Sequence, residues 1–271
     1  MTFASPPPPA SPPAYETGAA THPGRVRSDN EDHFVLLPDS GVFAVADGMG
    51  GHEAGSLASS TVVDALRTIG VPASAPDLLA RLEDRILRAN ARLREAARDH
   101  GGNAVVGSTV VALLVFGANY AVLWSGDSRL YLVRDGRIAQ LTRDHTEAQE
   151  LVDKGVLRAD EAKSWPRRNI VTRALGVYDV PELDIDHGVL EPGDTFIICS
   201  DGLTAHVGDD EILAHVEHSE PQPACDALVA LALERGGSDN VTVLVIRHRA
   251  ESARRGTRGR SGARPSRLDA R

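Results

Sequence analysis

The sequence has little cysteine and few aromatic residues. Only Cys199 and Cys225 occur in 271 residues, so the chain has neither a disulfide framework nor a cysteine spacing suited to zinc. Sparse cysteine is typical of a reducing compartment, and we expect a cytoplasmic protein. Aromatic residues make up 4% of the chain, which predicts a core built from valine, leucine, isoleucine and alanine.

The chain also lacks a secretory signal and an uninterrupted membrane-spanning run. Its first residues, MTFASPPPPASPPAYE, have neither a basic start nor an apolar centre. The most apolar segment, residues 104–124, is long enough to span a bilayer, but GAN at 117–119 interrupts it. Two core strands joined by a tight turn fit this pattern better than one helix, so no membrane span is expected.

Charge is distributed unevenly along the chain. Residues 249–271 contain eight arginines and two acids, a net charge of +6, whereas the whole chain carries −9. The preceding 248 residues therefore carry −15, which argues against nucleic acid as the main partner. The Arg/Gly/Ser composition of 249–271 is typical of a disordered, solvated tail.

The remaining chain has the pattern of one α+β domain. A proline-rich lead covers residues 1–14, and residues 15–248 show no break in composition. Hairpin-linked strands and helices that occur in separate runs predict antiparallel sheets. We expect strands at 33–38, 41–46, 108–116, 120–125, 130–142 (two strands around Asp135-Gly136), 195–200 and 241–248, and helices at 54–69, 78–97, 209–217 and 222–235.

The stretch VFAVADGMGGHEAG, residues 42–55, raises the question of whether its glycines cradle a phosphate. A P-loop requires a lysine where this chain has Ser56. A dinucleotide-binding loop that begins at Gly48 and Gly50 requires a third glycine where this chain has Glu53. Both phosphate-loop motifs therefore fail at a required residue.

Acidic residues at the ends of four predicted strands suggest a metal site instead. Asp47, Asp127 and Asp201 each follow a strand, and Asp239 precedes one. In antiparallel sheets such ends can meet at one edge, where the carboxylates would repel one another unless cations lay between them. Oxygen ligands without a histidine–cysteine set favour Mg²⁺ or Mn²⁺, and Gly48 would let the main chain approach an ion.

A charged turn upstream could complete a phosphate-hydrolysis site. The segment GRVRSDNEDHF places Arg27, Glu31 and Asp32 just before a strand. A guanidinium can bind phosphate oxygens in a bidentate way, and the two acids could hold metal-bound water. Taken alone, however, the segment reads equally well as an ordinary charged turn.

Together these segments resemble metal-dependent protein phosphatases of the protein phosphatase 2C type, especially their compact bacterial members. The resemblance covers residues 16–247 and is most specific in DGMGGH, GDSR, CSDGL and DNVT, which occur in the family's order. It implies a four-layer α-β-β-α sandwich of two antiparallel sheets flanked by helices. It also implies hydrolysis of phosphoserine and phosphothreonine in proteins by a metal-activated bridging water, opposing a serine/threonine protein kinase.

The resemblance also assigns roles at the site. Asp47 would bridge two Mn²⁺ or Mg²⁺ ions, one also bound by the Gly48 carbonyl and the other by Asp201 and Asp239. Asp127 would join Asp201 at a weaker third ion. Arg27 would hold the substrate phosphate, and the residues supporting metal-bound water or the ligands would be Glu31, Asp32 and Asn240.

Two further residues within the region of the resemblance each allow two roles. His52 lies near the expected site, where a structural or hydrogen-bonding role is favoured over general acid catalysis. In the expected flap, residues 145–175, Trp165 stands where bacterial relatives commonly carry histidine. It would be either a platform for the substrate peptide or a packing residue of the flap.

Two other function classes stay open at this point. A catalytically silent module of the same fold could bind phosphoproteins, although every expected acid is present. A metallohydrolase could instead act on small phosphate esters. Phosphatase activity that requires Mn²⁺ and is abolished by EDTA and by Asp47→Asn would exclude the silent binding module. A comparison of rates on a phosphopeptide and on metabolite esters would distinguish a protein phosphatase from a metallohydrolase of small esters.

Overall fold

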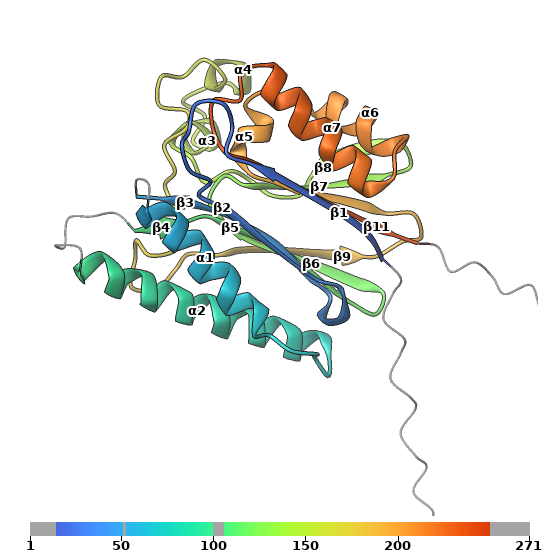
Figure 1. Cartoon of the computed structure of the whole chain (residues 1–271), viewed down its shortest axis with the longest axis horizontal. Coiled ribbons are helices and arrows are strands. Elements are labelled where there is room, and N and C mark those ends of the chain that lie inside the picture. The colour runs from blue at the N-terminus through green and yellow to red at the C-terminus, as the bar shows by residue number, and fades with distance from the viewer. Residues whose placement is uncertain (1–14, 51–52, 100–105, 250–271) are drawn as a thin grey trace, which may run out of the picture.

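Two antiparallel sheets form the centre of the computed structural model, which describes residues 15–50, 53–99 and 106–249 (Figure 1). The five-stranded sheet has the order β1 (Tyr15–His22), β11 (Val241–His248), β10 (Thr195–Cys199), β7 (Arg129–Arg134) and β8 (Arg137–Gln140). The six-stranded sheet has the order β2 (Asp32–Leu37), β3 (Val42–Met49), β5 (Val110–Phe116), β6 (Asn119–Ser125) and β9 (Asp184–Val189), with β4 (Gly107–Ser108) paired to β3.

Successive side chains of a strand point to opposite faces of its sheet, and both faces of each sheet are buried. Phe43 and Val45 of β3 pack with Phe196 and Ile198 of β10 in the layer between the sheets. Ala44, the residue between Phe43 and Val45, points to the opposite face and joins the core under the helices. Because both faces of a central strand are covered, its sequence is a nearly continuous apolar run.

Helices cover both outer faces, which gives the four-layer sandwich that the resemblance implied. The long pair α1 (Glu53–Arg67) and α2 (Ala75–Asp99) packs on the six-stranded sheet. The helices α5 (Asp201–Thr204), α6 (Asp209–Glu217) and α7 (Pro221–Glu234) pack on the five-stranded sheet. No helix among the described residues is both long and apolar enough to cross a bilayer.

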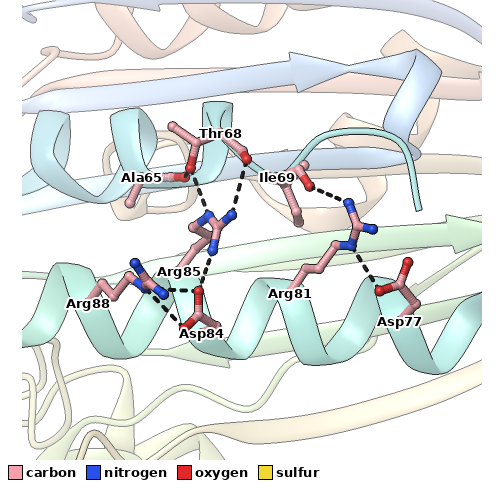
Figure 2. A network of polar contacts seen from close by, with 8 residues as sticks. All are labelled: Ala65, Thr68, Ile69, Asp77, Arg81, Asp84, Arg85 and Arg88. Atoms are coloured by element: carbon pink, nitrogen blue, oxygen red, sulfur yellow. Dashed lines mark hydrogen bonds and ion pairs between the residues drawn. The ribbon is translucent and has the colours of Figure 1, made fainter. Parts of the chain in front are cut away.

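Arginines of α2 hold the C-terminal end of α1 (Figure 2). Arg81 Nη1 donates to the Ile69 carbonyl at 3.1 Å, and Arg85 Nε donates to Thr68 Oγ1 at 2.7 Å. Arg85 also contacts the Thr68 carbonyl at 3.3 Å and pairs with Asp84. Thr68 and Ile69 directly follow α1. These contacts therefore place positive charge at the C-terminal end of α1, which stabilises a helix, and they hold α1 against α2.

The expected strands and helices are all present; α6 and β11 have the expected bounds, and the other boundaries are shifted. The strand expected to end at 46 continues to Met49, so Asp47 and Gly48 lie within β3 rather than after it. The strand expected at 108–116 is divided at Thr109 into β4 and β5. Elements not expected from the sequence are β1, β9, the 3₁₀ helix η1 (Pro38–Ser40), α3 (Glu147–Asp153), α4 (Ala159–Ala162) and α5.

The proline-rich lead and residues 250–271 of the expected tail lie outside the described residues, as does His52. Arg249, the first residue of the expected tail, is described. Its guanidinium donates to Glu16 Oε1 on β1 at 2.6 Å.

Candidate metal centre

A cavity of about 840 Å³ opens where the ends of both sheets meet loop 23–31. Five aspartates line it, namely Asp29, Asp47, Asp127, Asp201 and Asp239, and so does Glu31. Of the site residues predicted from the sequence, Asp32 alone is absent from this lining. The predicted residues that line the cavity are Arg27, Glu31, Asp47, Gly48, Asp127, Asp201, Asp239 and Asn240.

The five-stranded sheet brings Asp201 and Asp239 together. Strands β10 and β11 are antiparallel, with Cys199 opposite Val243, and the Ser200 N–H donates to the Thr242 carbonyl at 3.1 Å. Asp201 follows β10 and therefore lies beside the start of β11. Asp239 is located two residues before that start, so the two acids lie at the same edge. This confirms the expectation that strand ends of opposite direction meet at one edge.

The six-stranded sheet supplies Asp47, and the passage between the sheets supplies Asp127. Asp47 of β3 is paired across the ladder with Asp32 of β2. Asp127 lies where the chain leaves β6 of one sheet and enters β7 of the other. Gly126 takes a φ of 115° at this crossing, a value that favours glycine.

Gly48 is required by packing. A Cβ at this position would lie 1.9 Å from the carbonyl oxygen of Gly55 in α1 and 3.0 Å from that of Glu31. The Gly48 N–H donates to the Glu31 carbonyl at 3.1 Å. The glycine therefore lets α1 and loop 23–31 approach β3 closely, which is a second reason for a small residue beside Asp47.

Asp32 is buried behind the cavity, with 4% of its surface exposed. Ser200 Oγ donates to its Oδ2 at 2.7 Å, which ties the two sheets together. Its Oδ1 has no hydrogen-bond partner among the described residues. Burial, followed by repulsion from Asp201 and Asp239, raises the pKa of Asp32 to about 7.

Three of the carboxyls in the cavity, those of Asp47, Asp127 and Asp201, have pKa values raised toward the protonated form. Burial raises the pKa of Asp47 and Asp127 well above the usual range, and neighbouring carboxylates add to the effect. Burial and then repulsion from Asp239 raise the pKa of Asp201 to about 6. A divalent cation would reverse this preference, so the oxygen-rich donor set and the unpartnered Asp32 oxygen fit Mg²⁺ or Mn²⁺.

The carboxylates share a cavity but do not surround one point. Among the described residues, no three acidic, histidine or cysteine side chains are grouped closely enough to form a ready metal site. Asp239 instead pairs with Arg27, whose Nη2 lies 2.8 Å from Asp239 Oδ2. Both side chains are partly exposed, at 55% for Arg27 and 39% for Asp239, so either can reorient.

Asn240 organises loop 23–31. Its Oδ1 accepts from the Glu31 N–H at 2.7 Å, and its Nδ2 donates to the carbonyls of Pro23 and Asp29, each at 2.9 Å. The amide therefore holds three points of the loop that carries Arg27 and Glu31. This contact set explains why an uncharged amide, rather than another acid, follows Asp239.

The structure adds positioning residues that the sequence did not reveal. Ser200 and Ser128 are neighbours of predicted acids, and that adjacency was the only available signal. His145 is the first residue of the expected flap, and its Nδ1 accepts from the Gly126 N–H at 3.1 Å while its Nε2 lies 3.2 Å from Asp184 Oδ2. This pattern places the ring proton on Nε2 and links the Asp127 turn to the flap.

Trp165 takes part in flap packing. Its Nε1 contacts Glu147 Oε1 of α3 at 3.5 Å, and Arg167 Nη2 pairs with Glu147 Oε2 at 2.8 Å. Among the described residues that line the cavity, the flap contributes Asn169 and Val171 rather than Trp165. These contacts favour the packing role over the substrate platform.

Comparison with known proteins places this chain in a family. The sequence model of protein phosphatase 2C matches residues 24–241. The chain is 38% identical over 223 residues to the serine/threonine protein phosphatase PstP of Mycobacterium tuberculosis, covering 82% of this chain and 43% of that protein. It therefore spans less than half the length of that relative.

Relatives of similar length and solved structures agree with this match. The serine/threonine phosphatase stp of Listeria welshimeri is 34% identical over 238 residues, covering 83% of this chain and 93% of that protein. The crystal structure of a PstP catalytic domain in complex with two manganese ions is similar with a TM-score of 0.77 and 35% identity, covering 87% of this chain and 99% of that one.

Proposed function

This chain belongs to the protein phosphatase 2C family, and we propose that its phosphatase domain hydrolyses phosphoserine and phosphothreonine in proteins with the help of divalent cations. The observation that carries the proposal is the shared cavity of Asp47, Asp127, Asp201 and Asp239. These carboxyls come from both sheets, and burial beside other carboxylates raises the pKa of Asp47, Asp127 and Asp201, which indicates a need for positive charge. The manganese in a solved relative supports the choice of ion.

We assign the ion-holding role to Asp47, the Gly48 carbonyl, Asp201 and Asp239, with Asp127 available to a weaker third ion. Two bound ions would lower the pKa of an attacking water and stabilise charge on the phosphate. The protein's own contribution is to fix the acids on rigid elements: Asp47 lies in β3, and Asp201 begins α5. Asp239 Oδ2 would become available as a ligand once either Arg27 or Asp239 reorients.

Arg27 has two partners in this proposal. In the structure its guanidinium neutralises Asp239, and it is more than half exposed beside the cavity. If a cation were bound at Asp239, the planar donors of Arg27 would be free to bind phosphate oxygens in a bidentate way. Asn240 holds the main chain of loop 23–31, which carries Arg27 beside the cavity.

Asp32 and Glu31 can hold solvent near the reacting phosphate. The unpartnered Asp32 oxygen is a hydrogen-bond acceptor that bound water would satisfy. Burial gives Asp32 a pKa near neutrality, so it can also carry a proton at physiological pH. Neither role requires a protein nucleophile, and both cysteines are buried, with Cys199 in β10 and Cys225 in α7.

The phosphorylated protein substrates imply a serine/threonine protein kinase as functional counterpart. The cytoplasmic location is part of the same proposal and is supported by two free, buried cysteines. Nucleic acid is not proposed as a partner, because the chain before residue 249 is strongly acidic.

Hydrolysis assays with matched variants test the proposal. The purified chain should dephosphorylate a phosphothreonine peptide with Mn²⁺, and EDTA should abolish the activity. Asp47→Asn should lower kcat at least about 10³-fold, equivalent to about 4 kcal/mol of transition-state stabilisation. Asp64→Asn, at an exposed position of α1, serves as the matched control and should retain activity.

The same assay separates the competing functions. Folded protein that binds the phosphopeptide without hydrolysing it would indicate a silent binding module. Higher kcat/KM on small metabolite esters than on the phosphopeptide would indicate a metallohydrolase of small molecules. Either result would overturn the proposal.

A further inference from the structure

Thr109 is a buried polar residue at the cavity wall. It stands between β4 and β5, is 1% exposed and lines the cavity together with Asp47 and Asp127. It also interrupts what the sequence predicted as one continuous strand. A buried hydroxyl at such a position requires hydrogen bonds, and the partners of this one connect two of the acids.

On one side, Thr109 holds both main-chain polar groups of Asp47. The Thr109 N–H donates to the Asp47 carbonyl at 2.8 Å, and Thr109 Oγ1 accepts from the Asp47 N–H at 3.0 Å. Ser108 Oγ donates to the same carbonyl at 3.1 Å. The orientation of the Asp47 main chain is therefore determined by the break between β4 and β5.

On the other side, Thr109 contacts the turn that carries Asp127. Its Oγ1 is hydrogen-bonded to Ser128 Oγ at 2.9 Å, and Ser128 is itself buried. Its side chain also packs on Gly126, where an added Cβ would lie 2.6 Å from both Thr109 Cβ and Cγ2. The hydroxyl and the methyl group of one residue thus contact both neighbours of Asp127.

We infer that Thr109 is a positioning residue that holds Asp47 and the Asp127 turn in a fixed relation for cation binding. The inference rests on the proposed metal-binding function of these two aspartates. The carboxylates of Asp47 and Asp127 repel each other, so hydrogen bonds that fix their main chains are needed to keep both within reach of shared ions. One hydroxyl that bonds to both segments provides such a frame across the two sheets.

Two substitutions separate the hydroxyl from the shape of the side chain. Thr109→Val keeps the size and removes the hydroxyl, whereas Thr109→Ser keeps the hydroxyl and removes the methyl group. Thr142→Val is the matched control, because Thr142 is also buried and its Oγ1 accepts a backbone N–H, that of Leu130, at 3.1 Å. The readouts are Mn²⁺ affinity by calorimetry, thermal stability of the metal-free protein, and kcat and KM at saturating Mn²⁺.

Thr109→Val should weaken Mn²⁺ binding about 10- to 100-fold and lower kcat about tenfold, as removal of groups behind metal ligands commonly does. The KM for the phosphopeptide should change less than about twofold, because the substrate contacts remain. Thr109→Ser, which keeps the hydroxyl, should retain most of the wild-type Mn²⁺ affinity and kcat. Thr142→Val should lower stability to a similar extent without changing Mn²⁺ affinity.

The inference is overturned if Thr109→Val loses stability only, with Mn²⁺ affinity and kcat like those of Thr142→Val. Should Thr109→Val not fold, Ser128→Ala removes the partner hydroxyl without touching β4 or β5, and unchanged Mn²⁺ affinity in that variant would overturn the inference too. Failure of the wild-type chain to bind Mn²⁺ or to hydrolyse phosphopeptide would overturn the proposed function itself, which makes the two failures distinguishable.

Discussion

Arg27 and Asp239 form an ion pair of 2.8 Å across the candidate metal centre, although they are 212 residues apart in the chain. The Arg27 guanidinium lies at the Asp239 carboxylate where, in the proposed function, a divalent cation would bind. In the proposed function, this pair would couple cation binding to phosphate binding, because Asp239 could pair with either Arg27 or an ion.

Arg27→Ala is therefore expected to separate metal affinity from substrate affinity. Mn²⁺ affinity should stay the same or increase, because a competing cation is lost, whereas the KM for a phosphothreonine peptide should rise about tenfold for the lost phosphate contact. Calorimetry and steady-state kinetics measure the two effects. Arg67→Ala, which removes an exposed arginine paired with Asp64 on α1, is the control, and weaker Mn²⁺ binding in Arg27→Ala would contradict the coupling.

Stability without metal should fall as pH rises. Burial lifts the pKa of Asp32 to about 7 and of Asp201 to about 6, above their usual value near 3.8. The native state then binds more protons than the unfolded state between these values, so the metal-free protein loses stability from about pH 4 to pH 7.

Mn²⁺ should offset this loss, so the rise in Tm that it causes should be larger at pH 8 than at pH 5. Thermal unfolding with EDTA or with Mn²⁺ across this range measures the difference. Asp32→Asn should flatten the pH dependence of the metal-free protein. A Mn²⁺ effect that is larger at pH 5 would contradict the assigned shifts.

Asn240→Asp should disturb loop 23–31 although it preserves size. The carboxylate cannot donate to the carbonyls of Pro23 and Asp29, and we expect the free energy of unfolding to fall by about 2 kcal/mol. Chemical denaturation measures this change. Asn119→Asp, at an exposed position of β6, should have little effect, and an equal loss in both variants would show that the loop contacts are not the cause.

Glu147→Ala should loosen the flap. Glu147 accepts from Trp165 and pairs with Arg167, so its removal frees both side chains. Trypsin cleavage at Arg167 and Arg168 should become faster, while Glu83→Ala on the exposed face of α2 should leave the cleavage rate unchanged. An unaltered rate in Glu147→Ala would mean that these contacts do not hold the flap.

The central strands and long helices could be predicted because burial on both sheet faces leaves a clear apolar pattern. Strands β1 and β9 could not, since they lie at sheet edges and carry polar residues and glycine in the sequences YETGAATH and DIDHGV. Edge strands bury less surface, so their sequences carry a weaker apolar pattern. Their strand conformation is stabilised by hydrogen bonds to the neighbouring strand. Helix α5 has only four residues, too few for a helical period.

The acids of the site could be predicted because Asp47, Asp127, Asp201 and Asp239 all stand at or near strand ends. The contacts that Asp239 makes with Arg27 and that Asp32 makes with Ser200 could not be predicted, because they depend on how the two sheets pack. Thr109 carried no signal, since a threonine within an apolar strand run is ordinary. The sequence also could not indicate that Asp239 would pair with arginine rather than face the other carboxylates.

Anomalous scattering from crystals soaked in Mn²⁺ tests the metal centre most directly. We predict two manganese peaks about 4 Å apart in the cavity, with Asp47 bound to both and with Asp201 and Asp239 turned toward one of them. Peaks elsewhere, or a cavity in which Asp239 keeps its pair with Arg27 and no ion contacts Asp47, would contradict the proposed chemistry.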